Sequence, residues 1–184
     1  MEIIFLRHGE TVWNRSGKWQ GHTDVPLSDA GRNQAKVASE KLKGEKIDAI
    51  FSSDLTRAYE TARIVAENLD TDGIIIDMNL RERNLGEIEG KTTLQISQIV
   101  GMNIEIADIV GKDLPVKGLE PIEMQFNRAR KFLNFINNRY GKILVVSHGV
   151  MIGIMLNIIT GEDFRSRKIE NCEIIRAQYN GFSL

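Results

Sequence analysis

Two histidines in this sequence are each followed directly by a glycine and preceded by an apolar run. In "FLRHGE", Arg7 precedes His8, and in "VVSHGV", Gly149 follows His148. If both runs are strands of a parallel sheet, both imidazoles lie at its carboxyl edge, where open sheets bind ligands. The rings converge if the strands are neighbours. Glycine lets backbone amides approach a ligand, and a helix that begins at Gly149 offers unpaired N–H groups to an anion.

A further cation and a carboxylate stand in two other charged segments. Arg57, in "SSDLTRA", falls in the first turn of a predicted helix for which Ser53 is the expected N-cap. A cation there opposes the helix dipole, so helix stability does not explain it, whereas a bound phosphate does. Glu82 is the best-placed acid in "LRERNLGEIEG", residues 80–90, although such a charged stretch is also typical of a solvated loop.

These residue types together suit phosphoryl transfer through a histidine. The neutral imidazole of His8 would attack phosphorus, and Arg7, Arg57 and His148 would hold the phosphate oxygens. Glu82 would protonate the departing oxygen. Each arginine contact to phosphate contributes roughly 1.5–3 kcal/mol. The scheme needs no metal ion and no other cofactor.

Other classes of function fit the sequence less well. The three histidines are far apart and form no HExxH pattern, and the single cysteine, Cys172, excludes a cysteine-based zinc site and an intrachain disulfide. A serine hydrolase would need a GxSxG elbow, which is absent. An inactive module that binds a phosphorylated ligand stays an alternative. Loss of His8, Glu82 or either arginine would favour it, and all are present.

Apolar runs alternating with helical patterns predict a three-layer α/β/α sandwich with a mostly parallel sheet. We expect strands at residues 2–6, 47–51, 73–77, 142–147 and 172–179. We expect helices from Ser28 to before Gly44, over residues 53–69, roughly from Pro121 to Arg139, and from Gly149 onward. No repeat or linker divides the 184 residues, so we expect a single domain over 1–184, with 82–120 as an excursion over the site.

The composition limits the kinds of partner that this protein could bind. A formal charge of −1 offers no electrostatic footprint for nucleic acid. The N-terminus "MEIIFLRHGE" has too short an apolar run for a signal peptide or a membrane span, and one cysteine suits a reducing compartment. We therefore expect a cytoplasmic protein whose partner is a small-molecule phosphate ester. The sequence patterns indicate no particular oligomeric state.

Five ordered segments resemble the signatures of a known family. "LRHGETVWN", "QGHTDVPLSDAGRNQA", "SSDLTRAYETA", "LRERNLGEIEG" and "VVSHGV" are similar, in this order, to the motifs of the histidine phosphatase superfamily, phosphoglycerate-mutase-like branch. The resemblance implies that His8 is phosphorylated during turnover and that Glu82 donates the proton. It also implies a phosphate pocket of Arg7, Arg57 and His148.

The resemblance adds three positions and contains two departures. Asn14, Gln20 and Gly21 match family positions that contact the phosphate or the rest of the substrate, although Asn14 also fits a turn cap. His22 fits a loop residue better than a ligand. "GLEP" at 118–121 stands where the family usually has Gly-Glu-Ser, and Ile88 replaces an aromatic residue. Both departures concern the shape of the substrate pocket.

The same resemblance leaves a phosphatase and a phosphoglycerate mutase open. Mutases of this family carry a longer insertion with a lysine and paired arginines, whereas residues 91–117 hold three lysines and no arginine, and Thr93 stands at the mutase lysine position. Arg83 nevertheless matches the mutase pattern. We therefore expect a phosphatase first and a mutase second. Sugar phosphates, phosphoglycerates, phosphoserine and a ribazole phosphate are all compatible substrates.

Overall fold

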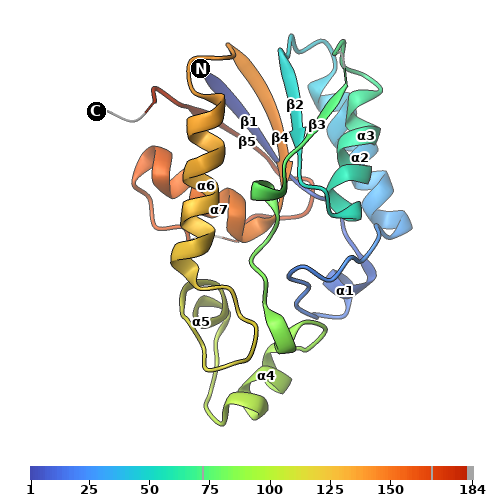
Figure 1. The fold of residues 1–184 in the computed structure, drawn as a ribbon. Helices are drawn as coiled ribbons and strands as arrows, with labels where there is room; N and C mark the ends of the chain where they lie inside the picture. Colours follow the sequence, from blue (N-terminus) through green and yellow to red (C-terminus); the bar gives the residue numbers. More distant parts are fainter. Residues whose placement is uncertain (72, 167, 182–184) are drawn as a thin grey trace.

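The computed structural model describes residues 1–71, 73–166 and 168–181, and its centre is a five-stranded sheet (Figure 1). The strand order is β3-β2-β4-β1-β5. Four strands are parallel, and only β5 runs antiparallel, beside β1. All five predicted strands are confirmed with small shifts at their ends: β1 Glu2–Arg7, β2 Ala49–Ser52, β3 Ile74–Ile76, β4 Lys142–Ser147 and β5 Ile174–Gln178.

Long helices cover both faces of this sheet. Figure 1 shows α2 and α3 on one face and α6 and α7 on the other, so the predicted three-layer α/β/α sandwich is confirmed. These four helices match the four predicted ones: α2 Asp29–Leu42, α3 Thr56–Ala66, α6 Ile122–Ile136 and α7 Gly149–Thr160. Within the described residues, no helix is both long enough and apolar enough to cross a membrane.

The alternation of side chains along the strands builds two cores. Ile3 and Phe5 of β1 pack with α6 and α7, while Ile4 and Leu6 pack with α2 and α3. Successive side chains of a strand point to opposite faces, so a strand covered on both faces must be apolar throughout. This explains why "EIIFL" and "KILVVS" are continuous apolar runs rather than alternating patterns.

The start of α3 differs from the prediction. Ser53 does not cap this helix, because α3 begins at Thr56 and its N-cap residue is Leu55, whose side chain makes no cap bond. Instead, Oδ1 of Asp24 accepts a hydrogen bond of 2.8 Å from the Thr56 amide. A cap supplied from a distant loop cannot be detected in a local pattern. The cap prediction was therefore wrong, and Ser53 is available for another contact.

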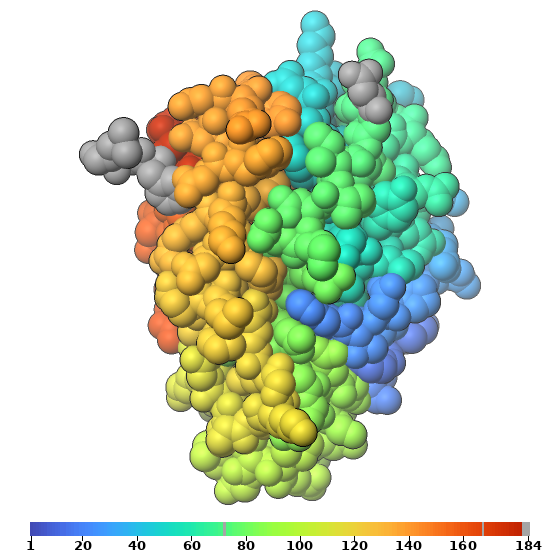
Figure 2. Space-filling model, in the orientation of Figure 1, coloured from blue at the N-terminus to red at the C-terminus, as the bar shows by residue number. Residues whose placement is uncertain are grey.

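Residues 82–120 contain helices that the sequence patterns did not predict. They are α4 (Thr93–Val100) and α5 (Ile106–Gly111), and the strand-free interpretation of this segment is confirmed. In Figure 2 this yellow-green segment forms the lower end of the molecule. It has an apolar cluster of its own, made of Leu85, Ile88, Ile96, Ile104, Ile109 and Leu114. The remaining short elements are α1 (Val12–Arg15) and the 3-10 turns Met78–Leu80 and Gly86–Ile88.

Candidate active site

Pairing of β1 with β4 brings the two histidines together. The strands are neighbours, with Arg7 opposite Ser147, so both His-Gly turns leave the sheet at the same edge. The ring centroids of His8 and His148 are 5.1 Å apart. Both side chains are buried, with 3% and 0% exposed. The predicted convergence of the two imidazoles is therefore confirmed.

Backbone contacts fix the orientation of the His8 ring. Its Nδ1 lies 2.7 Å from the carbonyl oxygen of Gly9. A carbonyl can only accept, so Nδ1 carries the ring proton and Nε2 keeps its lone pair. The Gly9 amide in turn donates to Oγ1 of Thr61 (3.0 Å), which donates to the Arg57 carbonyl (2.7 Å). The ring is thereby tied to helix α3.

The two glycines after the histidines have different reasons to be glycine. A Cβ on Gly9 would lie 2.5 Å from the Gly31 carbonyl oxygen, so the start of α2 forbids any side chain there. A Cβ on Gly149 would meet only the Arg7 side chain, at ordinary contact distances of 3.6 Å or more. Gly149 begins α7 as predicted. Close helix packing, more than approach to a ligand, therefore accounts for Gly9.

A serine holds the second imidazole. Nε2 of His148 lies 3.0 Å from Oγ of Ser53, and this Oγ already accepts a bond of 3.3 Å from the Leu55 amide. We assign the ring proton of His148 to Nδ1, the tautomer in which the serine hydroxyl can donate to Nε2. This Nδ1 is buried and has no hydrogen-bond partner among the described residues.

Burial and the neighbouring cations keep both imidazoles neutral. Burial, followed by the charge of Arg57, holds the pKa of His8 and of His148 well below the usual histidine value. A neutral imidazole with a free Nε2 is the nucleophilic form of histidine.

Two guanidinium groups flank these rings, that of Arg57 fully buried and that of Arg7 partly buried. Nη1 of Arg7 donates to the Ile169 carbonyl (2.5 Å), while Arg57 donates to the carbonyls of Thr23 (2.9 Å) and Gly21 (2.8 Å). The Nε–H groups of both arginines are buried without a partner within the described chain. Burial lowers the pKa of Arg57 to about 10, and the carboxylate of Glu82 acts against this shift. Both guanidinium groups therefore stay charged near neutral pH. Each has an unused N–H donor that an anion could accept from.

Glu82 lies at the same edge, on the chain that follows β3. Its Oε1 accepts from the Arg83 amide (3.0 Å) and from Nε2 of Gln125 (3.2 Å). Its Oε2 accepts from the amide of Val150 (3.1 Å), the second residue of α7. The carboxylate also raises the pKa of Arg7 and Arg57, against the effect of their burial. The acid and the two cations therefore share one electrostatic environment.

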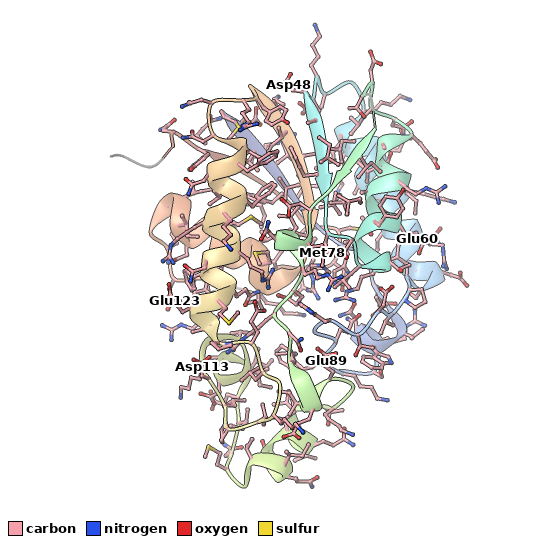
Figure 3. The ribbon with its side chains drawn as sticks, viewed as in Figure 1. Asp48, Glu60, Met78, Glu89, Asp113 and Glu123 are labelled. Carbon is pink, nitrogen blue, oxygen red and sulfur yellow. The ribbon has the colours of Figure 1, made fainter. Side chains whose placement is uncertain are left out.

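The loop of Gln20 and Gly21 contacts the Arg57 guanidinium through the Gly21 carbonyl. Gly21 has a left-handed φ of 54°, and a Cβ on it would lie 2.1 Å from Oε1 of Glu89, so no other residue fits. The Glu89 carboxylate, labelled in Figure 3, accepts from the amides of His22 and Thr23, both at 2.8 Å. Gln20 is buried and its Oε1 accepts from Thr11 (3.0 Å).

Asn14 is part of a helix cap at the start of α1. Its Oδ1 accepts from the backbone amide of Thr11 (3.0 Å) in a capping box at the start of α1, so the cap interpretation is confirmed. Nδ2 of Asn171 lies 3.5 Å from the same oxygen and donates to the His8 carbonyl (2.9 Å). Asn171, from the C-terminal part of the chain, thus connects Asn14 to the segment of His8.

Comparison with known proteins agrees with the resemblance. The sequence model of the histidine phosphatase superfamily (branch 1) matches residues 3–183. This chain belongs to that superfamily. "Phosphoglycerate mutase-like protein 4" of Arabidopsis thaliana is 36% identical over 188 residues, which cover 100% of this chain and 79% of the relative.

Solved structures of similar fold include two proteins titled as phosphatases. A mycobacterial glucosyl-3-phosphoglycerate phosphatase, solved with VO3, is 26% identical with a TM-score of 0.81 and matches 95% of this chain and 90% of its own. A phosphoserine phosphatase of Entamoeba histolytica, solved with 3-phosphoglyceric acid, is 26% identical with a TM-score of 0.76 and matches 95% and 89%. The superfamily therefore contains both phosphatases and mutase-like proteins similar to this chain.

Arg83, which matches the mutase pattern of the superfamily, bonds through its guanidinium to residues 109–120. Only 1% of it is exposed, and it donates to the carbonyls of Glu120 (2.8 Å), Ile109 (3.1 Å) and Lys112 (3.0 Å). It also pairs with Asp113 at 2.6 Å, a residue that Figure 3 places beside the start of α6. The Arg83 guanidinium therefore stabilises the segment of residues 82–120.

Several supporting residues of this histidine phosphatase site were missed from the sequence. Thr61 could have been found, because it stands four residues after Arg57 on the same helical face. The others reach the site from separate segments and leave no local pattern: Ser53 in a contact to His148, Glu89, Gln125 and Asn171.

Proposed function

We propose that this protein is a phosphomonoester phosphatase that acts on a small phosphorylated metabolite through a phosphohistidine at His8. The observation that carries the proposal is a neutral, buried His8 with a free Nε2, beside Arg7 and Arg57 with unpartnered Nε–H groups. Buried donors without partners are costly, at about 1–3 kcal/mol each, and a bound phosphate would satisfy them.

In the first step, Nε2 of His8 attacks phosphorus and the bond from phosphorus to the ester oxygen breaks. Arg7, Arg57 and the Nδ1–H of His148 hold the phosphate oxygens while charge spreads over them. The carboxyl group of Glu82 gives its proton to the departing oxygen. An alcohol leaves, and the phosphoryl group stays on His8.

In the second step, water replaces the alcohol. The Glu82 carboxylate takes a proton from the water, whose oxygen attacks phosphorus, and the bond from phosphorus to Nε2 breaks. Inorganic phosphate leaves and His8 returns to its neutral form. Glu82 returns to its protonated form for the next cycle.

The existing hydrogen bonds of Arg83 support a phosphatase over a mutase. A mutase must exclude water and hold the substrate carboxylate with cations. Arg83 is already bonded to three carbonyls and Asp113, and Thr93, at the mutase lysine position, accepts a bond of 3.1 Å from Trp19. Two of the similar solved structures are titled as phosphatases of phosphorylated metabolites.

The phosphohistidine is tested by intact-mass measurement on rapidly quenched enzyme. We expect an acid-labile phosphate adduct with a phosphate ester, and no adduct in His8→Ala. An adduct that persists in that variant would contradict the assignment of His8. Absence of both adduct and released phosphate with every ester in a substrate panel would favour the inactive binding module.

Phosphorus NMR separates phosphatase from mutase. The sample is 3-phosphoglycerate with a trace of 2,3-bisphosphoglycerate. We expect slow or absent formation of 2-phosphoglycerate. Rapid formation of 2-phosphoglycerate with little inorganic phosphate would establish the mutase instead.

A further inference from the structure

Gln125 is a fully buried amide that the chemistry described above does not use. It lies on α6 with 0% of its surface exposed, and its Nε2 donates to Oε1 of Glu82 (3.2 Å). Its own Oε1 is buried and has no hydrogen-bond partner among the described residues. A buried amide with an unpaired oxygen is a poor way to stabilise a core. An apolar side chain of the same size would pack there at lower cost.

The contacts of Glu82 divide its two oxygens between different tasks. Oε1 accepts two hydrogen bonds, from the Arg83 amide and from Gln125. Oε2 accepts one, from Val150 at the start of α7, immediately after His148. Oε2 is therefore the oxygen bonded to the start of α7, and it has the greater remaining capacity to bond.

We propose that Gln125 is a positioning residue for Glu82: it holds Oε1, so that Oε2 is the oxygen that exchanges a proton with the leaving group. This inference rests on the proposed function. Without Gln125, one backbone amide would hold each oxygen, Arg83 at Oε1 and Val150 at Oε2, and Oε1 would have no side-chain donor. The second donor to Oε1, Gln125 of helix α6, fixes the plane of the carboxyl group. None of these bonds to Oε1 has to break when Oε2 gives up its proton.

Replacement by methionine separates positioning from packing. Gln125→Met fills a similar volume without polar atoms. We expect kcat on an alkyl phosphate to fall about tenfold, the effect of one hydrogen bond to a charged group. KM should stay the same. On p-nitrophenyl phosphate, whose phenolate leaves without a proton, the fall should be smaller than twofold. The melting temperature should not decrease, because the unpaired amide oxygen is removed.

The pH profile gives a second readout. The isosteric Gln125→Glu can donate to Glu82 only while it is protonated. This conservative variant should therefore retain activity at the acidic end of the profile and lose it at the basic end.

Ser39→Ala is the matched control for a lost buried polar group. Ser39 is 2% exposed and bonds to the Ile64 and Val65 carbonyls, far along the chain from Glu82. We expect it to lower the melting temperature and to leave the ratio of alkyl to aryl activity unchanged. Equal losses on both substrates with a lower melting temperature in Gln125→Met would overturn the proposal.

The same assays distinguish this failure from failure of the proposed function. If Glu82→Gln shows the leaving-group dependence and Gln125→Met does not, only the role of Gln125 is wrong. If the unchanged protein releases no phosphate from any ester, the proposed function itself is wrong.

Discussion

The two halves of the candidate site are built in opposite ways. The phosphate half, made of Arg7, His8, Arg57 and His148, keeps N–H groups at three of these residues that have no partner within the described parts of the chain. The acid half consists of Glu82 and the groups around it, and there the carboxylate accepts three hydrogen bonds. The first half has unmet capacity for an anion, whereas the second restrains a carboxyl group. In the proposed reaction, the groups that bind the phosphate need unused hydrogen-bond donors. The carboxyl group that gives the proton needs its hydrogen bonds already made.

The origin of the restraints differs as well. His8 and His148 are placed by the pairing of two adjacent strands. The chain at Glu82 is instead held by Arg128 of α6, which donates to the carbonyls of Asn79 (2.8 Å), Arg81 (2.9 Å) and Glu82 (3.1 Å). Arg128 also pairs with Glu120 at 2.8 Å. The acid half therefore depends on contacts between elements that are distant in the sequence.

Removal of the acid should produce the largest selective effect. We expect Glu82→Gln to lower kcat on an alkyl phosphate by about 10²- to 10⁴-fold, the range of general acid catalysis. The loss on p-nitrophenyl phosphate should be much smaller, because its leaving group needs no proton. Steady-state rates on both esters measure the ratio. Equal losses would indicate another acid, with Glu10 or Glu120 as the next candidates.

A change in the phosphate half should affect every ester alike. Arg57→Lys keeps a charge but loses the planar fork that bonds to the Gly21 and Thr23 carbonyls and leaves Nε–H for the ligand. We expect kcat/KM to fall about 10²-fold on alkyl and aryl phosphates together. A loss confined to alkyl phosphates would show that the two halves are not separate.

This contrast explains what could be predicted from the sequence. The sheet and the phosphate half follow from apolar runs, because a buried strand is apolar throughout and its carboxyl end faces the ligand edge. Glu82 itself was found as an acid in a charged segment. Its restraint by Gln125 and Arg128 was not, since neither residue lies near it in sequence. Helices α4 and α5 were missed because short helices that pack around a small cluster show little periodicity.

The phosphate half should make the protein sensitive to acid. The pKa of His8 and of His148 is held well below the usual value by burial, so the unfolded chain binds more protons than the folded one below about pH 6.5. Stability should therefore fall as the pH decreases, by up to about 1.4 kcal/mol per pH unit for each histidine. Urea unfolding at pH 7 and pH 5.5 measures this fall. In His8→Gln the dependence should be weaker, and an unchanged slope would contradict the assignment to His8.

The smallest effect concerns a restraint of the phosphate half that comes from a distant loop. Asp24 caps α3, the helix of Arg57, through the Thr56 amide at 2.8 Å. We expect Asp24→Ala to lower the free energy of unfolding by about 1 kcal/mol, because an N-cap bond is lost. Asp24→Asn is the matched control: its amide oxygen can still accept the bond, so it should lose no more than a few tenths of a kcal/mol. Chemical denaturation measures both variants. If both variants destabilise the protein equally, the contribution of Asp24 comes from its charge near Arg57 and not from the cap.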